Sequence, residues 1–304
     1  MKYVLTTHNL TKKIGNKTLV SDLNMHIQKG GIYGFLGPNG AGKTTTMKMI
    51  TNLWKPTSGE IILFEQKLRP DSYEVFKRIQ SIIEFPVFYE GLSAEANLRL
   101  HCEYLGYYRK NAVEEVLDVL ALSDDKSKKV REFSLGMKQR LGIARAILTK
   151  PELLILDEPA NGLDPEGIKQ MRQLLVRLSR QYGISILISS HILSEIQNMA
   201  NTIGIIKKGK LCEEISMDMI SELGMEYIEL VTPDIKKASY LLSSEMNLRN
   251  FKILEENRLR IYNTDIPTEQ ISALFGRNKI ALKALHVKTE SLEDYYLKVI
   301  GEGK

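Results

Sequence analysis

Residues 37–45 read GPNGAGKTT and contain the pattern G-x-x-x-x-G-K-[ST]. The glycines allow backbone conformations that aim several N–H groups into one concavity, and they let a phosphate approach closely. The stretch follows an apolar segment at residues 31–36, which we predict as a strand, and it opens a predicted helix at about residues 42–53, whose N-terminus adds partial positive charge. We therefore expect a phosphate-binding loop in which Lys43 reaches the β- and γ-phosphates of ATP and Thr44 ligates Mg²⁺. The residues expected to contact the nucleotide in this loop are Gly37, Pro38, Asn39, Gly40, Ala41, Gly42, Lys43, Thr44 and Thr45.

Residues 153–158, LLILDE, carry the second half of this chemistry. Four apolar residues predict a buried strand, and two carboxylates emerge at its C-terminal end, where ligands lie in open α/β sheets. Asp157 is placed to hold Mg²⁺, directly or through water, and Glu158 is placed to orient or deprotonate an attacking water. A strand ending in Asp-Glu is a weak signal by itself, but after a phosphate loop it predicts hydrolysis of the triphosphate.

The hydrophobic pattern of the chain predicts an α/β fold. Near the N-terminus, alternation of apolar and polar residues indicates a β-structured part, with one side formed by Leu19, Leu23, Met25 and Ile27. Residues from about 90 to 150 are predicted to be mostly helical. Apolar strands at residues 153–156, 184–189 and 202–207 then alternate with a helix whose first position is Pro165. Such alternation favours a mostly parallel sheet covered by helices on both faces.

Both the charge balance and the order of predicted strands and helices change near residue 215. Basic residues outnumber acidic ones before this point and acidic residues slightly outnumber basic ones after it, within a net charge of +5. We therefore expect a nucleotide-binding domain at residues 1–215, which contains the helical subdomain, and an accessory domain at residues 216–304. The accessory domain has the predicted order β-α-β-β-α-β, with its last strand at residues 280–287, followed by a final helix at residues 292–300. That order predicts a small ferredoxin-like α+β domain.

Two further segments narrow the class of nucleotide-binding protein. Residues 133–140 read FSLGMKQR and precede Asp157, whereas His191 follows a predicted strand downstream of Glu158. With the phosphate loop, these motifs stand in the order found in the ATP-binding subunits of ABC transporters, which residues 1 to about 215 resemble. The FSLGM run resembles the signature motif of that family, residues 160–164 resemble its D-loop, and His191 resembles its switch histidine.

The resemblance implies that the site is completed by a second copy of the chain. Ser134 is expected to cap a helix whose free N–H groups bind an anion, which in the family is the γ-phosphate of ATP held by the opposite subunit. One site would combine the phosphate loop of one copy with Ser134 and Gly136 of the other, in a two-fold homodimer. Glu158, His191 and Lys43 are the expected catalytic residues. The resemblance also implies a separately encoded transmembrane permease as partner, and a cytoplasmic location on the inner face of the membrane through that permease.

Three positions depart from the commonest pattern of the family. Leu135 stands where a second adjacent glycine is usual, Glu84 stands where the Q-loop has glutamine, and Ile14 stands where an aromatic residue stacks on adenine. A carboxylate can still accept a hydrogen bond from metal-bound water, so Glu84 is expected beside Mg²⁺ together with Asp157. The departures at Glu84 and Leu135, and the tail SLEDYY at residues 291–296, resemble the ATPase subunits of bacitracin-type and lantibiotic-immunity exporters. This implies export of an antimicrobial peptide or another amphiphile.

The loop at residues 85–91 contains Phe85, Phe88 and Tyr89. In the family this region docks on the membrane subunit, and aromatic side chains are common anchors for a partner helix. Local packing of the loop is an equally good interpretation of the sequence alone.

The composition argues against several other classes of protein. The chain has 304 residues, of which 43% are hydrophobic and 26% charged, as in ordinary folded proteins. No apolar run approaches the ~18–20 residues needed to cross a bilayer, and the N-terminus lacks the apolar stretch of a secretion signal. Cys102 and Cys212 are isolated, so we interpret them as reduced thiols of a cytosolic protein. The basic residues form no dense nucleic-acid-binding patch, so nucleic acid is not an expected partner.

Three functions other than transport also use a phosphate loop of this kind. ABC ATPases of translation resemble two cassettes in tandem, whereas this chain has one phosphate loop. Chromosome-maintenance ATPases need a long coiled coil between the phosphate loop and Asp157, for which this chain has no room. A non-catalytic binding or regulatory module is disfavoured by the intact Lys43, Thr44, Asp157, Glu158 and His191, although Leu135 and Glu84 leave reduced turnover open. A soluble ABC-type ATPase with a non-transport regulatory role stays as the alternative.

Overall fold

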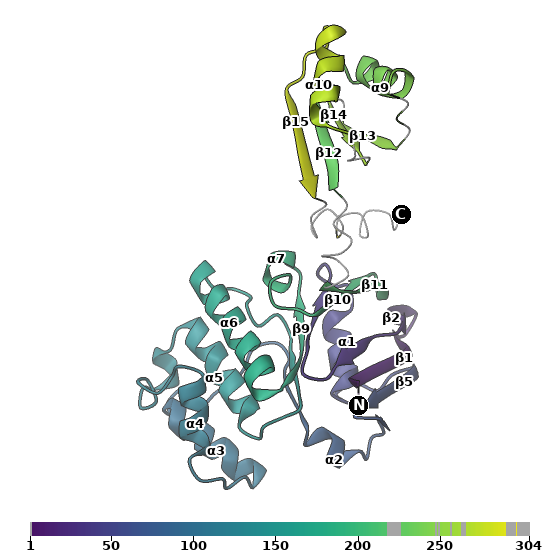
Figure 1. The fold of residues 1–304 in the computed structure, drawn as a ribbon. Coiled ribbons are helices and arrows are strands. Elements are labelled where there is room, and N and C mark those ends of the chain that lie inside the picture. Colours follow the sequence, from purple (N-terminus) through teal and green to yellow (C-terminus); the bar gives the residue numbers. More distant parts are fainter. Residues whose placement is uncertain are drawn as a thin grey trace. The chain divides into compact units, whose positions relative to one another are not determined.

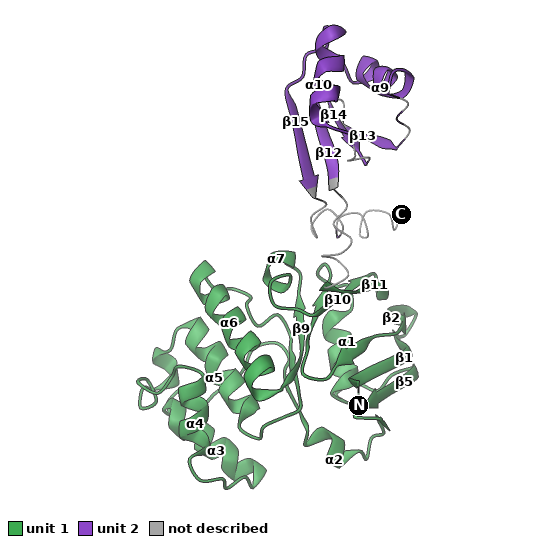
Figure 2. Cartoon of the chain, in the orientation of Figure 1, with its two compact units in different colours: residues 1–218 green, residues 219–304 purple. Residues whose placement is uncertain are grey.

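The computed structural model divides the chain into two compact units, residues 1–218 and residues 219–304 (Figures 1 and 2). The structure describes residues 2–217, 226–246, 248, 250–255, 257–262, 266–289 and 296. The division falls close to residue 215, where the charge balance of the sequence changes.

A six-stranded sheet forms the centre of unit 1, with the strand order β11-β10-β4-β9-β8-β7. The pairs within β10-β4-β9-β8-β7 are all parallel, and only β11 joins antiparallel. The strands β4, β8 and β9 are buried along their whole length, which explains their continuous apolar runs. The predicted mostly parallel sheet is therefore confirmed. Its strands are β4 (Ile32–Leu36), β7 (Ile79–Ile82), β8 (Leu153–Leu156), β9 (Ser185–Ser190), β10 (Thr202–Lys207) and β11 (Lys210–Ser216).

A second, antiparallel sheet is built from the N-terminal strands of unit 1. Its strands are β1 (Tyr3–Ile14), β2 (Lys17–Leu23), β3 (His26–Gln28), β5 (Ser58–Leu63) and β6 (Gln66–Lys67). The predicted alternation holds for Leu23, Met25 and Ile27, which are fully buried. It fails at Leu19, which is only half-buried while Val20 is fully buried. The cause is a shift in the pairing register between β1 and β2, which reverses the side on which residues point.

Helices pack around these two sheets (Figure 1). Helix α1 buries Met47, Met49 and Ile50 in a core shared with strands of both sheets. It ends at Ile50, earlier than the predicted residue 53. The helix that begins at Pro165 is present and is capped by Asp164, whose carboxylate accepts a hydrogen bond from the Gly167 N–H at 2.9 Å. The helices of unit 1 are α1 (Lys43–Ile50), α2 (Tyr73–Phe76), α3 (Ala94–Leu105), α4 (Ala112–Val119), the 3₁₀ turn η1 (Val130–Glu132), α5 (Leu135–Ile147), α6 (Pro165–Tyr182) and α7 (Leu193–Ile196).

Unit 2 has the element order β-α-β-β-α-β that the sequence predicts. Its four strands form one antiparallel sheet in the order β13-β14-β12-β15. The last strand begins at Ala284, later than predicted, and Ile280 ahead of it is buried in the same core as Phe275. The predicted final helix at residues 292–300 and the SLEDYY tail lie outside the described residues, apart from Tyr296. The elements are β12 (Glu226–Val231), α9 (Ile235–Ser244), β13 (Phe251–Glu255), β14 (Arg258–Ile261), α10 (Thr268–Arg277) and β15 (Ala284–Thr289).

Candidate active site

The phosphate loop joins the C-terminal end of β4 to the first residue of α1. Gly40 and Gly42 have φ angles of +77° and +111°, which glycine adopts at little cost. Gly37 is required for space, because an added Cβ would lie 2.3 Å from the carbonyl oxygen of Ile206. Helix α1 starts at Lys43, so the N–H groups of its first turn lack intrahelical partners and face the loop. The loop therefore has the geometry of an anion-binding concavity.

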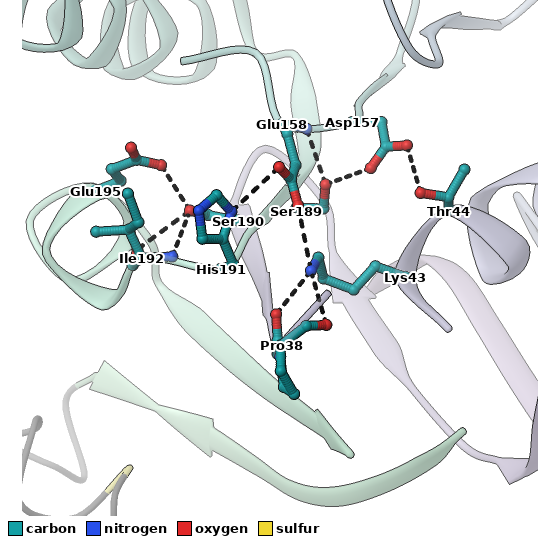
Figure 3. Close-up of polar contacts among 11 residues, drawn as sticks. Pro38, Lys43, Thr44, Asp157, Glu158, Ser189, Ser190, His191, Ile192 and Glu195 are labelled. Carbon is teal, nitrogen blue, oxygen red and sulfur yellow. Dashed lines mark hydrogen bonds and ion pairs between the residues drawn. The ribbon is translucent and has the colours of Figure 1, made fainter. Parts of the chain in front are cut away.

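Lys43 is almost fully buried under this loop, with 5% of its surface exposed. Its ammonium donates hydrogen bonds to the carbonyl oxygens of Gly37 at 2.7 Å and Pro38 at 3.3 Å. Figure 3 shows the same ammonium turned toward the carboxylate of Glu158, at 3.2 Å. Because the chain is folded around it on both sides, Lys43 is held in place before any phosphate arrives.

Asp157 lies at the end of β8 and is fixed by two hydroxyl groups (Figure 3). Thr44 donates to one carboxylate oxygen at 2.7 Å, and Ser189 donates to the other at 2.6 Å. Ser189 is placed there because β9 pairs in parallel with β8, so that the two strand ends lie side by side. Sequence reasoning missed this serine. The signal was the pair Ser189-Ser190, two polar residues that directly follow the apolar run at residues 186–188.

Glu158 has a left-handed backbone, with a φ angle of +47°. This conformation is unfavourable for a residue with a side chain, and it is held here by a hydrogen bond from the Glu158 N–H to the Ser189 hydroxyl at 2.9 Å. One carboxylate oxygen faces Lys43, and the other lies 3.1 Å from Nδ1 of His191. About a fifth of the Glu158 side chain is exposed, so water can reach it.

His191 follows β9 and sits in a turn with its own hydrogen bonds. The Ser190 hydroxyl donates to Glu195 at 2.6 Å and accepts from the Ile192 N–H at 2.9 Å. These bonds hold the backbone on both sides of His191, so that the imidazole points at Glu158 (Figure 3). The structure thus gathers the predicted residues Lys43, Asp157, Glu158 and His191, with Thr44, at one edge of the six-stranded sheet.

The donor set at this edge fits Mg²⁺. The Thr44 hydroxyl and the Asp157 carboxylate are hard oxygen donors, and they already touch each other. No group of three or more histidine, cysteine or acidic side chains that could hold a metal occurs among the described residues. A site of this kind matches Mg²⁺, which proteins bind through one or two oxygen ligands while phosphates and water complete the octahedron.

Ser134 and Gly136 lie at the N-terminus of α5, outside the group formed by Lys43, Thr44, Asp157, Glu158 and His191. Ser134 caps α5, and its hydroxyl accepts a hydrogen bond from the Met137 N–H at 3.2 Å, as predicted. Both residues line a surface cavity of about 400 Å³, the signature cavity. Further lining residues come from the D-loop and the start of α6, including Gly162 and Leu163. The structure therefore brings the signature residues to the D-loop of the same chain and not to the phosphate loop.

Glu84 and Ile14 are the two other positions that depart from the commonest family pattern. The Glu84 carboxylate accepts a hydrogen bond from Lys48 at 2.8 Å, and this ammonium lowers the pKa of Glu84 below its usual value. Within residues 2–217, no hydrogen bond or ion pair joins Glu84 to Thr44 or Asp157. Ile14 ends β1 with half of its surface exposed, so it presents an apolar side chain beside Gly15.

The aromatic loop at residues 85–91 borders a second cavity, of about 340 Å³. The cavity is also lined by Arg145, which donates to the Val87 carbonyl at 2.7 Å and lies over the Phe88 ring at 4.7 Å. Burial lowers the pKa of Arg145 and, with the nearby guanidinium, also lowers the pKa of His101. Phe88 is thus engaged by local packing, whereas Phe85, Val87 and Tyr89 stay exposed.

Comparison with known proteins agrees with this geometry. Residues 20–161 match the family described as ABC transporter. An uncharacterized ABC transporter ATP-binding protein, YcbN, from Bacillus subtilis (strain 168) is 56% identical over 99% of this chain and 98% of its own. The bacitracin transport ATP-binding protein BcrA from Bacillus licheniformis is 44% identical over 100% of this chain and 99% of its own. A solved dimeric ATP-binding cassette with bound ADP and phosphate, in a post-hydrolysis state, is 25% identical with a TM-score of 0.62, over 70% of this chain and 98% of that one.

The predicted resemblance to bacitracin-type ATPases is thus confirmed over the whole chain. Among the described residues, no helix has both the length and the apolar character needed to cross a membrane. Since the similarity to the first two relatives extends through unit 2 as well as unit 1, it covers more than the motifs of the phosphate site. The chain belongs to the ATP-binding proteins of ABC transporters.

Proposed function

We propose that this chain hydrolyses ATP to drive a separately encoded transmembrane permease, at whose cytoplasmic side it is bound. The observation that carries the hydrolysis step is the contact series from Lys43 through Glu158 to His191, with distances of 3.2 Å and 3.1 Å. It places one cation and one imidazole on either side of a water-accessible carboxylate. The bound Mg²⁺, held by Thr44 and Asp157, would offset charge on the phosphates.

In the proposed reaction, each side chain has one task. Lys43 leaves the carbonyls of Gly37 and Pro38 for the β- and γ-phosphates, which compete for the same ammonium. Once it does so, Glu158 is free to accept a proton from, or to orient, a water in line with the γ-phosphate. His191 holds the other oxygen of Glu158 and so keeps that carboxylate in position.

We further propose that the active site needs two copies of the chain. The separation of the signature cavity from the phosphate loop supports this, because the helix N-terminus capped by Ser134 has no phosphate to bind within its own chain. In a two-fold pair, the α5 N-terminus of one copy faces the phosphate loop of the other. The solved relative with ADP and phosphate is described as dimeric.

Mixing two inactive variants tests this arrangement. We expect Lys43→Ala and Ser134→Ala chains to hydrolyse ATP slowly when assayed separately. In a mixed pair, the Ser134→Ala copy supplies Lys43 and the Lys43→Ala copy supplies Ser134, so one of the two sites is intact. Since half of the pairs in an equal mixture are mixed, the rate should recover to roughly a quarter of the wild-type rate. A mixture no faster than the mean of its components would contradict the shared site.

The permease is proposed to dock at the exposed side chains of the aromatic loop. Val87 is 79% exposed, with Phe85 and Tyr89 beside it, next to the cavity over Arg145. Apolar side chains grouped around a concave site suit a partner helix that inserts its own apolar residues.

We propose that the permease carries bacitracin or a similar amphiphilic peptide, because the relative BcrA is a bacitracin transport ATP-binding protein.

A charged side chain introduced into the aromatic loop should prevent binding of the permease. We expect Val87→Asp to lower co-purification with the membrane protein encoded beside the chain by more than about tenfold, because burying an unpaired carboxylate in an interface is costly. Bacitracin resistance conferred by the pair should fall with it. Tyr73→Asp is the control, since Tyr73 is 71% exposed on α2. If the Val87 variant still co-purifies like wild type, the docking surface is wrong; if no membrane protein co-purifies with the wild-type chain, the soluble regulatory ATPase becomes the better interpretation.

A further inference from the structure

The signature segment and the D-loop of this chain interlock through two leucine–glycine contacts. Leu135 is the first residue of α5 and is 40% exposed in the signature cavity. Its Cδ2 lies 3.1 Å from the position that a Cβ on Gly162 would take. In the reverse direction, Cδ2 of Leu163 lies 3.6 Å from the position of a Cβ on Gly136. Each leucine thus covers the backbone of a glycine on the opposite segment.

Gly162 suits this contact for two reasons. It has no side chain, so Leu135 can approach its backbone, and its φ angle of +79° lies in the region that favours glycine. Outside Gly162 and its chain neighbours, Leu135 provides the only described atom within 4 Å of that Cβ position, so a glycine at position 135 would remove the contact. The contact therefore depends on the residue that departs from the common signature pattern.

The turn that Leu135 contacts leads directly to Glu158. The Asn161 N–H donates to the Glu158 carbonyl at 3.0 Å, and the Leu163 N–H donates to the Ala160 carbonyl at 3.2 Å. After the turn, the cap of Asp164 on Gly167 fixes the start of α6. Gly162 is thus the point between these bonded ends at which a neighbouring side chain can set the position of the turn.

We propose that Leu135 is a positioning residue: by packing on Gly162 it sets the turn that carries Glu158. This inference rests on the proposed function, in which the Ser134 end of α5 contacts the nucleotide of the partner copy. In that dimer, the N-terminus of α5 contacts the ATP held by the partner copy, whereas Glu158 acts on the ATP held by its own chain. Leu135 then connects these two sites. Its removal should slow hydrolysis without weakening the binding of ATP to the phosphate loop, which lies elsewhere.

A double-mutant cycle between Leu135 and Gly162 tests the contact. The rate is measured on the full-length chain at saturating ATP and at protein concentrations where the rate per chain no longer rises. We expect Leu135→Ala to lower kcat by about fivefold with an unchanged KM, and Leu135→Met, which keeps the apolar reach, to stay near wild type. Gly162→Ala should also lower kcat, because its methyl group meets Leu135 and its backbone is strained.

The double variant measures the coupling between Leu135 and Gly162. With Leu135 already shortened to alanine, the methyl group of Gly162→Ala has room, so its further effect on kcat should be at least about threefold smaller than in the wild-type chain. Leu105, another exposed leucine on α3, provides the control. The effects of Leu105→Ala and Gly162→Ala should simply multiply.

Hydrogen exchange gives a readout that does not depend on catalysis. The Asn161 amide, bonded to Glu158, should exchange several-fold faster in Leu135→Ala, whereas the Ile168 amide, bonded to Asp164 inside α6, should not change. Multiplicative effects of Leu135→Ala and Gly162→Ala, or unchanged exchange at Asn161, would overturn the proposal. The mixing experiment with the Lys43 and Ser134 variants tests the shared site separately, and each experiment can fail while the other succeeds.

Discussion

Glu158→Gln is expected to lower kcat by roughly 100- to 1,000-fold while the chain still binds ATP. The amide keeps the size of the carboxylate and can still contact His191, so the geometry of the site is retained. What it loses is the acceptor for the proton of the attacking water. Because Lys43 can still leave its 3.2 Å contact with residue 158 for the phosphates, nucleotide binding should persist.

The measurement for Glu158→Gln combines hydrolysis with size-exclusion chromatography. With ATP and Mg²⁺ the variant should elute as a stable pair of chains, since the step that separates them is blocked. Glu213→Gln is the matched control, because Glu213 is exposed on β11 and is not among the bonded partners of Lys43, Asp157, Glu158 or His191. Hydrolysis by Glu158→Gln at the wild-type rate would show that another group handles the water.

The parts of the site that local sequence determines were predictable. The phosphate loop has fixed glycine spacing, and Asp157 and Glu158 sit where an apolar strand ends, which in a parallel sheet is the ligand edge. Ser134 is a helix cap directly before a helical run, and the structure shows that cap. Each of these features depends on a few consecutive residues, so sequence spacing alone carries the information.

The remaining features depend on residues that meet only after folding. Ser189 binds Asp157 because β9 lies beside β8, and no spacing within either strand reveals that pairing. In the same way, Lys48 lies far from Glu84 in sequence yet binds its carboxylate. The prediction that Glu84 lies beside Mg²⁺ was made without this cation, because only the fold brings Lys48 to Glu84.

The fold shows the same division between local and non-local information. The main strands and helices of unit 1 and the element order of unit 2 followed from hydrophobic periodicity. The side predicted for Leu19 was wrong, because a register shift with β1 intervenes. Such a shift is set by the partner strand and by the turn between the strands, so the pattern within β2 does not contain it.

Lys43→Ala is expected to weaken ATP binding by at least about 30-fold. Charge-assisted contacts from a buried ammonium to phosphate are strong, and truncating one partner of a buried charge pair typically costs ~2–5 kcal/mol. The loss is compounded by Glu158, whose carboxylate would face the incoming phosphates without the cation that now stands 3.2 Å away. Both effects act in the same direction, so the decrease in affinity should be larger than removal of a surface lysine can produce.

Titration calorimetry with ATP and Mg²⁺ measures this change directly. Lys77→Ala is the matched control: Lys77 is exposed and pairs with Glu74 on the surface, so its loss should alter affinity less than about twofold. Since Lys43 is buried and bonded to the loop carbonyls, thermal unfolding of both variants shows whether each retains its fold. Unchanged ATP affinity in a folded Lys43→Ala chain would mean that this ammonium belongs to Gly37, Pro38 and Glu158 alone, and that the phosphate loop binds its ligand through backbone N–H groups without it.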